Sequence, residues 1–184
     1  MNLVTIMFRL FILVLIASGC STTFAEQFSV GSVVKNVSPQ RIEKDVQTLV
    51  DFGTRHTLSD TSSPDRGIGA ARRWIEAEFR RISKACNGCL EVVVQSDIIS
   101  GEPRIPEPTE VVNVYAVQRG STDPERIVIM SGDIDSRVTD PMNFTDDSPG
   151  ANDNASGMAA AIEAARVLSK HRFPATIILS LIHI

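Results

Sequence analysis

The stretch SPGANDNASG, residues 148–157, places one aspartate between two asparagines directly in front of an alanine-rich segment. Ala-Ser-Gly leads into residues 156–168, whose apolar residues recur with the period of a helix. Upstream, SGDIDSR (residues 131–137) directly follows the apolar run at 127–130. The order strand, acidic loop, helix predicts carboxylates at the carboxyl end of a buried strand and again at the start of the next helix.

Outward from this stretch, the chain alternates between helix-type and strand-type segments. One helix is expected over residues 38–53, with Ser38 as its cap, Pro39 in its first turn and Gly53 at its end. A Pro-rich connection interrupts regular structure over residues 101–108. Another helix is expected at about 65–84, and strands at 90–94, 111–117, 126–130 and 175–179.

The expected strands are apolar runs rather than alternating patterns, which is typical of strands buried on both faces. Together with the intervening helices they predict an α/β fold with a mostly parallel or mixed central sheet covered on both faces. The chain is long enough for about one domain.

The first 25 residues have the pattern of a secretory signal peptide. Arg9 precedes an apolar run at residues 10–17 that is too short to cross a bilayer, and Thr23-Phe24-Ala25 suits cleavage before Glu26. Lipoprotein processing at Cys20 is one alternative, and an internal hydrophobic helix is another. The sequence therefore predicts a secreted or periplasmic protein, with membrane attachment only if Cys20 carries a lipid.

Composition narrows the function classes. The net charge is −4, and signal removal would leave 159 residues with a net charge of −5, because only one arginine is lost. No basic stripe remains, so a nucleic-acid partner is not expected. Cys86 and Cys89, in CNGC, favour a structural disulfide in an oxidising compartment. A redox dithiol and half of a zinc site are the alternatives, the latter without a second cysteine pair or a nearby histidine.

The acidic loops allow two interpretations. Singly, Asp153 or Asn154 is a plausible helix cap and Asp135 a turn former. A cap needs only one such residue, however, whereas Asn-Asp-Asn behind Pro-Gly offers several oxygens on a rigid frame, as a divalent cation requires. A single carboxylate can also offer an oxygen to each of two metal ions. The flanking amides of Asn152 and Asn154 are expected to hold such a carboxylate by hydrogen bonds.

The segment from SGDIDSR to SPGANDNASGMAAAIEAARVLS resembles the secreted two-zinc aminopeptidases, family twenty-eight of the metallopeptidases. Their pattern is Ser-Gly-His-x-Asp-Ser, a variable loop, and Pro-Gly-Ala-x-Asp-x-Ala-Ser-Gly before a helix. The upstream FGTRHT (52–57) and GIGAARRWIEAEF (67–79) are similar to the lead-in of this family. The resemblance implies a zinc-exopeptidase-like sandwich that removes N-terminal residues from peptide or protein substrates, with two zinc ions.

The resemblance also implies a role for each aspartate. Asp153 corresponds to the carboxylate that bridges both zinc ions, and Asp135 to the catalytic-site aspartate that orients a ligand beside the metal. Asp133 stands where the family has a zinc-binding histidine; we expect it to bind metal through oxygen, the alternative being one weakened metal site. His56 and His171 are distant from the loop in sequence, and for His56 a surface or cap role is expected.

After the strand that here lies at 175–179, the family has a Glu-Glu pair and later a further Asp and a His, and this sequence stops before those parts. We therefore expect residues 26–184 to be the N-terminal part of one peptidase domain, catalytically silent and poorly folded alone, with an open apolar sheet edge. The final LSLIHI (179–184) resembles a translated sequencing adapter, the alternative being a natural strand end.

Two other functions stay open for the parent protein. One is a glutaminyl-cyclase-like acyltransferase with a single zinc, which the exchange at Asp133 makes conceivable. The other is a non-catalytic binding domain on the same fold. Substrate is expected to enter over the loop at residues 136–148, where Asn143 and Phe144 offer contacts.

Overall fold

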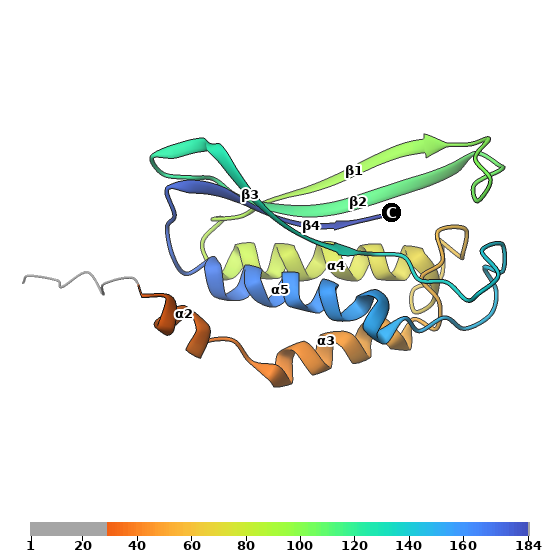
Figure 1. Ribbon diagram of the computed structural model, residues 1–184, viewed down its shortest axis with the longest axis horizontal. Coiled ribbons are helices and arrows are strands. Elements are labelled where there is room, and N and C mark those ends of the chain that lie inside the picture. The colour runs from red at the N-terminus through yellow and green to blue at the C-terminus, as the bar shows by residue number, and fades with distance from the viewer. Residues whose placement is uncertain (1–28, 184) are drawn as a thin grey trace, which may run out of the picture.

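The computed structural model describes residues 29–183 and shows a sheet lying over a layer of helices (Figure 1). The predicted signal peptide, Cys20 and Ile184 lie outside the described residues, so these predictions stay open. Within residues 29–183, no helix combines the length and the hydropathy needed to cross a bilayer.

The helices follow the sequence pattern closely. They are α2 (Val30–Lys35), α3 (Pro39–Asp51), α4 (Gly67–Ala85) and α5 (Ser156–Leu168), the last preceded by a π-helical turn, η1 (Ala151–Ala155). As predicted, the Ser38 hydroxyl caps α3 by accepting from the Arg41 amide, and Pro39 occupies the first turn. The short α2 and the turn η1 were not predicted.

The sheet is mixed. Its strands are β1 (Glu91–Ile99), β2 (Thr109–Gln118), β3 (Asp123–Asp133) and β4 (Ala175–Ile182), in the spatial order β1-β2-β4-β3. Only β3 and β4 are parallel; β2 runs antiparallel to both β1 and β4. Each strand is longer than predicted, because hairpin pairing continues β1 and β2 to the Pro-rich loop regardless of side-chain hydropathy. The predicted α/β class is confirmed.

Only one face of the sheet is covered by the described residues, so the prediction of helices on both faces is wrong for residues 29–183. Figure 1 shows α4 and α5 side by side against the sheet, with α3 packed on the far side of α5. The large apolar side chains exposed on the strands are Val94, Ile98, Ile127, Val128, Ile129 and Met130. An apolar run signals a tendency to be buried, but burial also requires a covering layer, and none is present here.

The core lies between the sheet and the two inner helices. Ile75 and Phe79 of α4, and Met158 and Ile162 of α5, are fully buried there. Leu179 and Leu181 of β4 join this core, and β4 pairs with β2 as far as Leu181 and with β3 as far as Ile182. The segment 179–182 thus packs as a central strand; whether residues 179–184 are native is a separate question that stays open.

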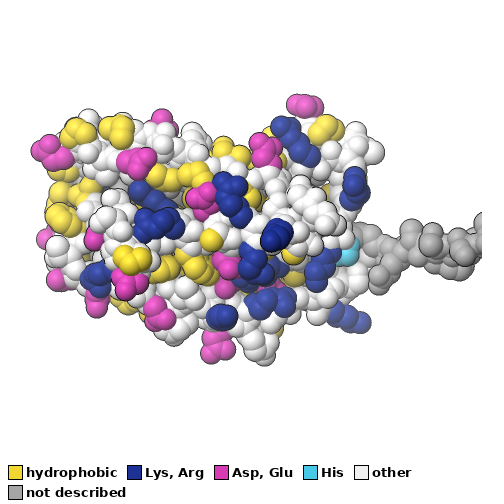
Figure 2. Space-filling view, turned by 180° about the vertical axis from the view of Figure 1, so that it is seen from behind, with side chains coloured by type: hydrophobic (Ala, Val, Ile, Leu, Met, Phe, Trp, Pro, Cys, Tyr) yellow, Lys and Arg dark blue, Asp and Glu magenta, His cyan; other side chains and the backbone are white. Residues whose placement is uncertain are grey.

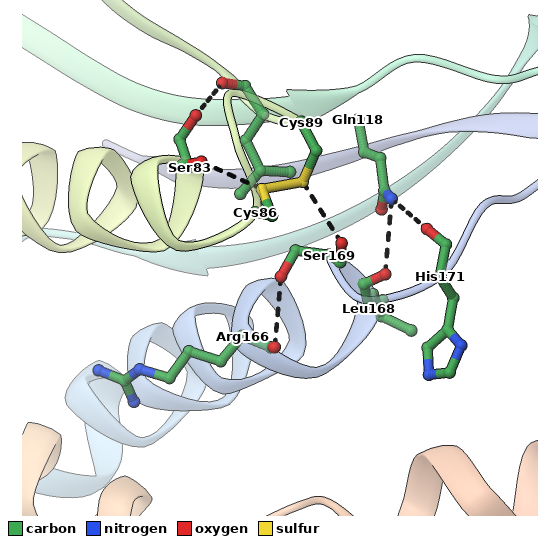
Figure 3. Close-up of a disulfide and its surroundings, with 9 residues drawn as sticks. Ser83, Cys86, Cys89, Gln118, Arg166, Leu168, Ser169 and His171 are labelled. Carbon is green, nitrogen blue, oxygen red and sulfur yellow. Dashed lines mark hydrogen bonds between the residues drawn. A yellow bond between two sulfur atoms is a disulfide. The ribbon is translucent and has the colours of Figure 1, made fainter.

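The predicted disulfide is present between Cys86 and Cys89 and joins the end of α4 to the start of β1. Figure 3 shows it beside the end of α5, where Cys89 Sγ lies 3.4 Å from the Ser169 carbonyl oxygen. The Gln118 amide of β2 donates to the His171 carbonyl over 2.6 Å. These contacts fasten the ends of both inner helices to the sheet.

A buried ion cluster joins the three longer helices. Arg166 of α5 pairs with Asp45 of α3, Glu78 of α4 and Glu163 of its own helix, and Arg41 also binds Glu163. Figure 2 shows further Lys and Arg side chains over the middle and right of one face, with acidic side chains between them. This mixture of signs agrees with the absence of a basic stripe from the sequence.

Candidate functional site

The three predicted aspartates line one cavity of about 490 Å³. Asp133 ends β3, Asp135 follows it after one residue, and Asp153 lies in η1. The remaining lining residues are Arg104, Ser136, Arg137, Val138, Thr139 and Gly150. Because β3 and α5 are consecutive and antiparallel in direction, the end of the strand and the start of the helix meet at one end of the molecule (Figure 1).

Close packing of two glycines brings the strand end and the helix start together. A Cβ placed on Gly132 would lie only 2.8 Å from backbone atoms of Gly157 and Met158. The backbone of β3 therefore touches the first turn of α5 directly, which any side chain at this position would prevent. Gly132 and Gly157 belong to the two motifs of the sequence analysis, SGDIDSR and SPGANDNASG.

Asp153 is not a helix cap. Gly150 begins η1 in the left-handed region (φ 49°), and Asp153 and Asn154 have non-helical backbone angles. Neither side chain caps η1 or α5, so the cap reading is wrong, and the exposed Asp153 carboxylate is left at the cavity. Among residues 29–183, neither Asn152 nor Asn154 donates the expected side-chain amide hydrogen bond to Asp153, and Asn154 Oδ1 is buried without a partner.

Arg55 organises the two acidic loops from beneath. It is fully buried, and its guanidinium donates to the carbonyls of Leu49, Ile134, Pro149 and Gly150 at 2.8–3.1 Å. Burial lowers the pKa of Arg55 to about 10, and the nearby Asp135 and Asp153 carboxylates act in the opposite direction. A buried cation therefore lies next to two of the three cavity aspartates.

Hydroxyl groups also join the loops that Arg55 connects. Ser136 Oγ accepts from the Arg55 amide and donates to the Ser148 carbonyl over 2.6 Å, and Ser148 Oγ lies 2.9 Å from Thr54 Oγ1. All three hydroxyl-bearing residues are buried. The segments 53–56, 134–136 and 148–150 thus form one hydrogen-bonded base beneath the cavity.

His56 is buried, so the predicted surface role is wrong. Its Nδ1 accepts from the Leu58 amide over 3.0 Å, which leaves Nε2 as the donor to the Pro141 carbonyl at 3.0 Å. The ring also lies 6.2 Å, between centroids, from Phe144. His56 therefore anchors the loop between β3 and η1 and does not line the cavity.

The sequence analysis did not predict the role of Arg55 or its contacts. The residue lies in FGTRHT, which was noted only as a lead-in, and three of the four carbonyls that it binds are about 80 or more residues away in the sequence. The available signal was an arginine inside an otherwise small and polar stretch directly after a helix.

The donor set suits a zinc ion only in part. Zinc sites in proteins use three or four Asp, Glu, His or Cys ligands. Within residues 29–183, no three such side chains lie close enough together to hold a metal ion. The cavity aspartates thus offer carboxylate oxygens of the right kind but an incomplete site, and further ligands would have to come from other residues.

The sequence of this chain is similar to those of known metallopeptidases. Residues 113–183 match Peptidase family M28. The chain is 50% identical over 156 residues to a probable zinc metalloprotease of Leptosphaeria maculans, and 51% identical over 148 residues to one of Pyrenophora teres f. teres. The chain belongs to peptidase family M28. These alignments cover 85% and 80% of the chain, but the chain spans only about a third of each relative, 36% and 31%.

Solved structures show the same fold. A glutaminyl cyclase from Fimbriiglobus ruber superimposes with a TM-score of 0.62 at 20% identity, covering 80% of this chain and 45% of its own. A leucine aminopeptidase precursor from Bacteroides thetaiotaomicron gives 0.57 at 21% identity, covering 77% and 46%. At these identities the likeness concerns the fold alone, so both chemistries remain compatible with the architecture of this M28 chain.

Proposed function

We propose that the full-length protein containing this chain is a zinc-dependent exopeptidase of the aminopeptidase type. The observation that supports it is the convergence of Asp133, Asp135 and Asp153 on one cavity, in an M28 chain related to probable zinc metalloproteases. Peptides or proteins with a free amino terminus are the proposed substrates, and two zinc ions the proposed cofactors.

The proposed roles follow from where each carboxylate lies. Asp153, at the start of the helix layer, and Asp133, at the end of β3, would hold metal through carboxylate oxygens. When bound, zinc would polarise the peptide carbonyl and acidify a water molecule. Asp135 would orient a ligand beside the metal, and its carboxylate would stabilise the charged form of the buried Arg55 nearby. The remaining ligands and the general base are assigned to residues outside 29–183.

The hydrogen-bonded segments beneath the cavity, 53–56, 134–136 and 148–150, keep the carboxylates in place. Arg55 binds the carbonyls on both sides of the cavity, and Ser136 joins the β3 loop to Ser148. Fixed carboxylates bind a cation without the cost of ordering two loops. Val138 and Thr139 of the loop at 136–148 line the cavity, and this loop is the proposed entry side for substrate.

The test uses the zinc-loaded full-length protein and three substrates: leucine anilide, its N-acetylated form, and a peptide with N-terminal glutamine. The proposal expects hydrolysis of the free-amine anilide but not of its N-acetylated form, no cyclisation of the glutamine peptide, and loss of both bound zinc and hydrolysis in Asp153→Ala. Asp97→Ala, an exposed aspartate of β1, is the matched control that should retain both. Cyclisation of the glutamine peptide without anilide hydrolysis would support a cyclase instead, and neither activity nor bound zinc would support a binding domain.

Export is proposed from the signal pattern alone. The mature N-terminus distinguishes its two forms: cleavage before Glu26 gives a free secreted protein, and a lipidated Cys20 gives an anchored one. Mass spectrometry of the N-terminal peptide from the native source reads this directly; an unprocessed Met1 terminus would overturn the proposal.

A further inference from the structure

We propose that Arg104 recognises a carboxylate on the peptide substrate, contributed either by an acidic side chain or by the free carboxyl terminus of a short peptide. This inference rests on the proposed exopeptidase function and names the substrate group that the site would prefer. It follows from the position of Arg104, its lack of partners and the charge balance of the cavity.

Arg104 is presented by a tight turn. Glu102 and Ile105 exchange backbone hydrogen bonds of 3.0 and 3.1 Å, so Pro103 and Arg104 occupy the two central positions between them. A third backbone bond, from the Gly101 amide to the Pro106 carbonyl, supports the turn from behind. Proline at the first central position restricts the backbone of the turn that carries Arg104.

The topology of the sheet places this turn at the cavity. β2 runs antiparallel to β4, and β4 parallel to β3. The start of β2, and with it the hairpin loop at 100–108, therefore lies at the same end as the last residue of β3, Asp133. Figure 1 shows this loop at the end of the molecule where α5 begins. Arg104 lines the cavity together with all three aspartates.

Arg104 is exposed and makes no hydrogen bond or salt bridge with any other residue in 29–183. Arg137, the second arginine of the cavity, differs because its Nη1 donates to the carbonyls of Val138 and Thr139. A guanidinium has five donors in a planar fork that matches a carboxylate. Of the two cavity arginines, Arg104 is thus the one with its whole fork available.

The charges that line the cavity indicate that it binds an anionic group of the substrate. Arginine next to a cation site repels the metal ion, so its presence at the cavity needs another explanation. Among residues 29–183, three carboxylates and two guanidinium groups line the cavity, so one divalent cation held there would change this sum from −1 to +1. A peptide that brings a carboxylate restores the balance and gains a charge-assisted hydrogen bond from Arg104.

The experiment compares three peptides of one length with the zinc-loaded full-length protein. They carry glutamine with an amidated C-terminus, glutamate with an amidated C-terminus, and glutamine with a free C-terminus. We expect kcat/KM to favour one acidic peptide over the neutral one by about tenfold, and Arg104→Gln to remove that preference mainly through KM. Arg104→Lys should restore part of it. Arg119→Gln, an exposed arginine at the opposite end, should leave the preference unchanged.

The outcomes separate the two proposals. The acidic peptide that is favoured identifies the source of the carboxylate. Equal preference in wild type and Arg104→Gln would overturn the role of Arg104 while leaving the exopeptidase function intact. If wild type hydrolyses none of the peptides, the exopeptidase proposal fails, and fluorescence anisotropy of the labelled peptides then decides on Arg104: tighter binding of an acidic peptide, lost in Arg104→Gln, supports its role, and equal binding overturns it.

Discussion

Arg55 donates a hydrogen bond of 3.1 Å from Nη2 to the carbonyl of Gly150, the residue that begins the turn carrying Asp153. The same guanidinium reaches the carbonyl of Ile134, between Asp133 and Asp135, through Nε. One buried side chain therefore sets the distance between the two loops that supply the acidic groups. The carboxylates of the cavity therefore depend on a residue that does not itself line the cavity.

Arg55→Met tests this dependence. The substitution keeps an apolar stem of similar length but leaves two buried and two part-buried carbonyls without their donor, which we expect to cost about 3 kcal/mol of unfolding free energy. Zinc affinity of the full-length protein should fall as well. Urea unfolding and zinc titration check both, with Arg119→Met as the control at an exposed site. Unchanged zinc affinity in a folded variant would show that the loops hold their separation without Arg55.

Asp133→His examines the departure from the family pattern. Imidazole is a neutral ligand that zinc prefers over a single carboxylate oxygen at such a position. If Asp133 is a metal ligand, the histidine variant of the full-length protein should bind zinc more tightly, by on the order of tenfold. Competition with a chromogenic chelator measures this. The matched control is Asp97→His on β1, and equal affinities for both variants would remove position 133 from the metal site.

The sequence was sufficient for features whose determinants are local. Ser38 and Pro39 specify the start of α3, and the apolar period of residues 156–168 specifies α5 with its observed bounds. Asp133, Asp135 and Asp153 were predicted to converge because the ends of strands and starts of helices meet at one edge. The structure places all three in one cavity; their chemical roles stay predictions.

Features that depend on distant segments were beyond the sequence. The apolar residues at 127–130 predicted burial on both faces, yet they are exposed because no described segment covers them. Arg55 and His56 look like surface residues by type, and only carbonyls from other segments explain their burial. Arg104 lies more than twenty-five residues from the acidic loops, so only the antiparallel hairpin reveals it as a neighbour.

The ion cluster around Glu163 predicts a dependence of stability on pH. Burial acts to raise the pKa of Glu163, but hydrogen bonds from Arg41 and from the Ser38 amide outweigh it, so the pKa lies below its usual value. A lowered folded-state pKa stabilises the protein above the unfolded-state value of about 4.3, and this stabilisation is lost as pH falls through the folded-state pKa. The unfolding free energy should therefore drop below about pH 4.

Glu163→Gln isolates this contribution. It should cost about 3 kcal/mol at pH 7, because Arg41 loses its ion-pair partner and Arg166 loses one of three, and it should flatten the acid limb of the stability curve. Urea unfolding from pH 7 to pH 3 checks both effects. Glu125→Gln, at an exposed position of β3, should leave the curve as in wild type. An acid limb of the same steepness in Glu163→Gln would assign it to other carboxylates.

The disulfide should matter for stability but not for the site. It closes a very short loop, so its reduction or Cys86→Ser with Cys89→Ser should cost about 2 kcal/mol. Figure 1 places the end of α4 opposite to the end where α5 begins, so zinc affinity should be unchanged. Thermal unfolding with and without a reductant, together with zinc titration, tests this. A weakened zinc site in the reduced protein would mean that the two ends are coupled.

The exposed edge strand β3 predicts the behaviour of residues 26–184 expressed alone. Ile127, Val128, Ile129 and Met130 are exposed, and β3 has no neighbour on its outer side among residues 29–183. Unpaired backbone groups beside apolar side chains favour association between copies. We expect this fragment to aggregate and to be inactive with added zinc, and Ile129→Lys to raise its solubility, as sedimentation and light scattering would measure. The control is Val34→Lys on α2, an equally exposed valine away from the sheet. If both lysine variants behave alike, net charge explains the effect; if the fragment is monomeric without them, the edge is not an association surface.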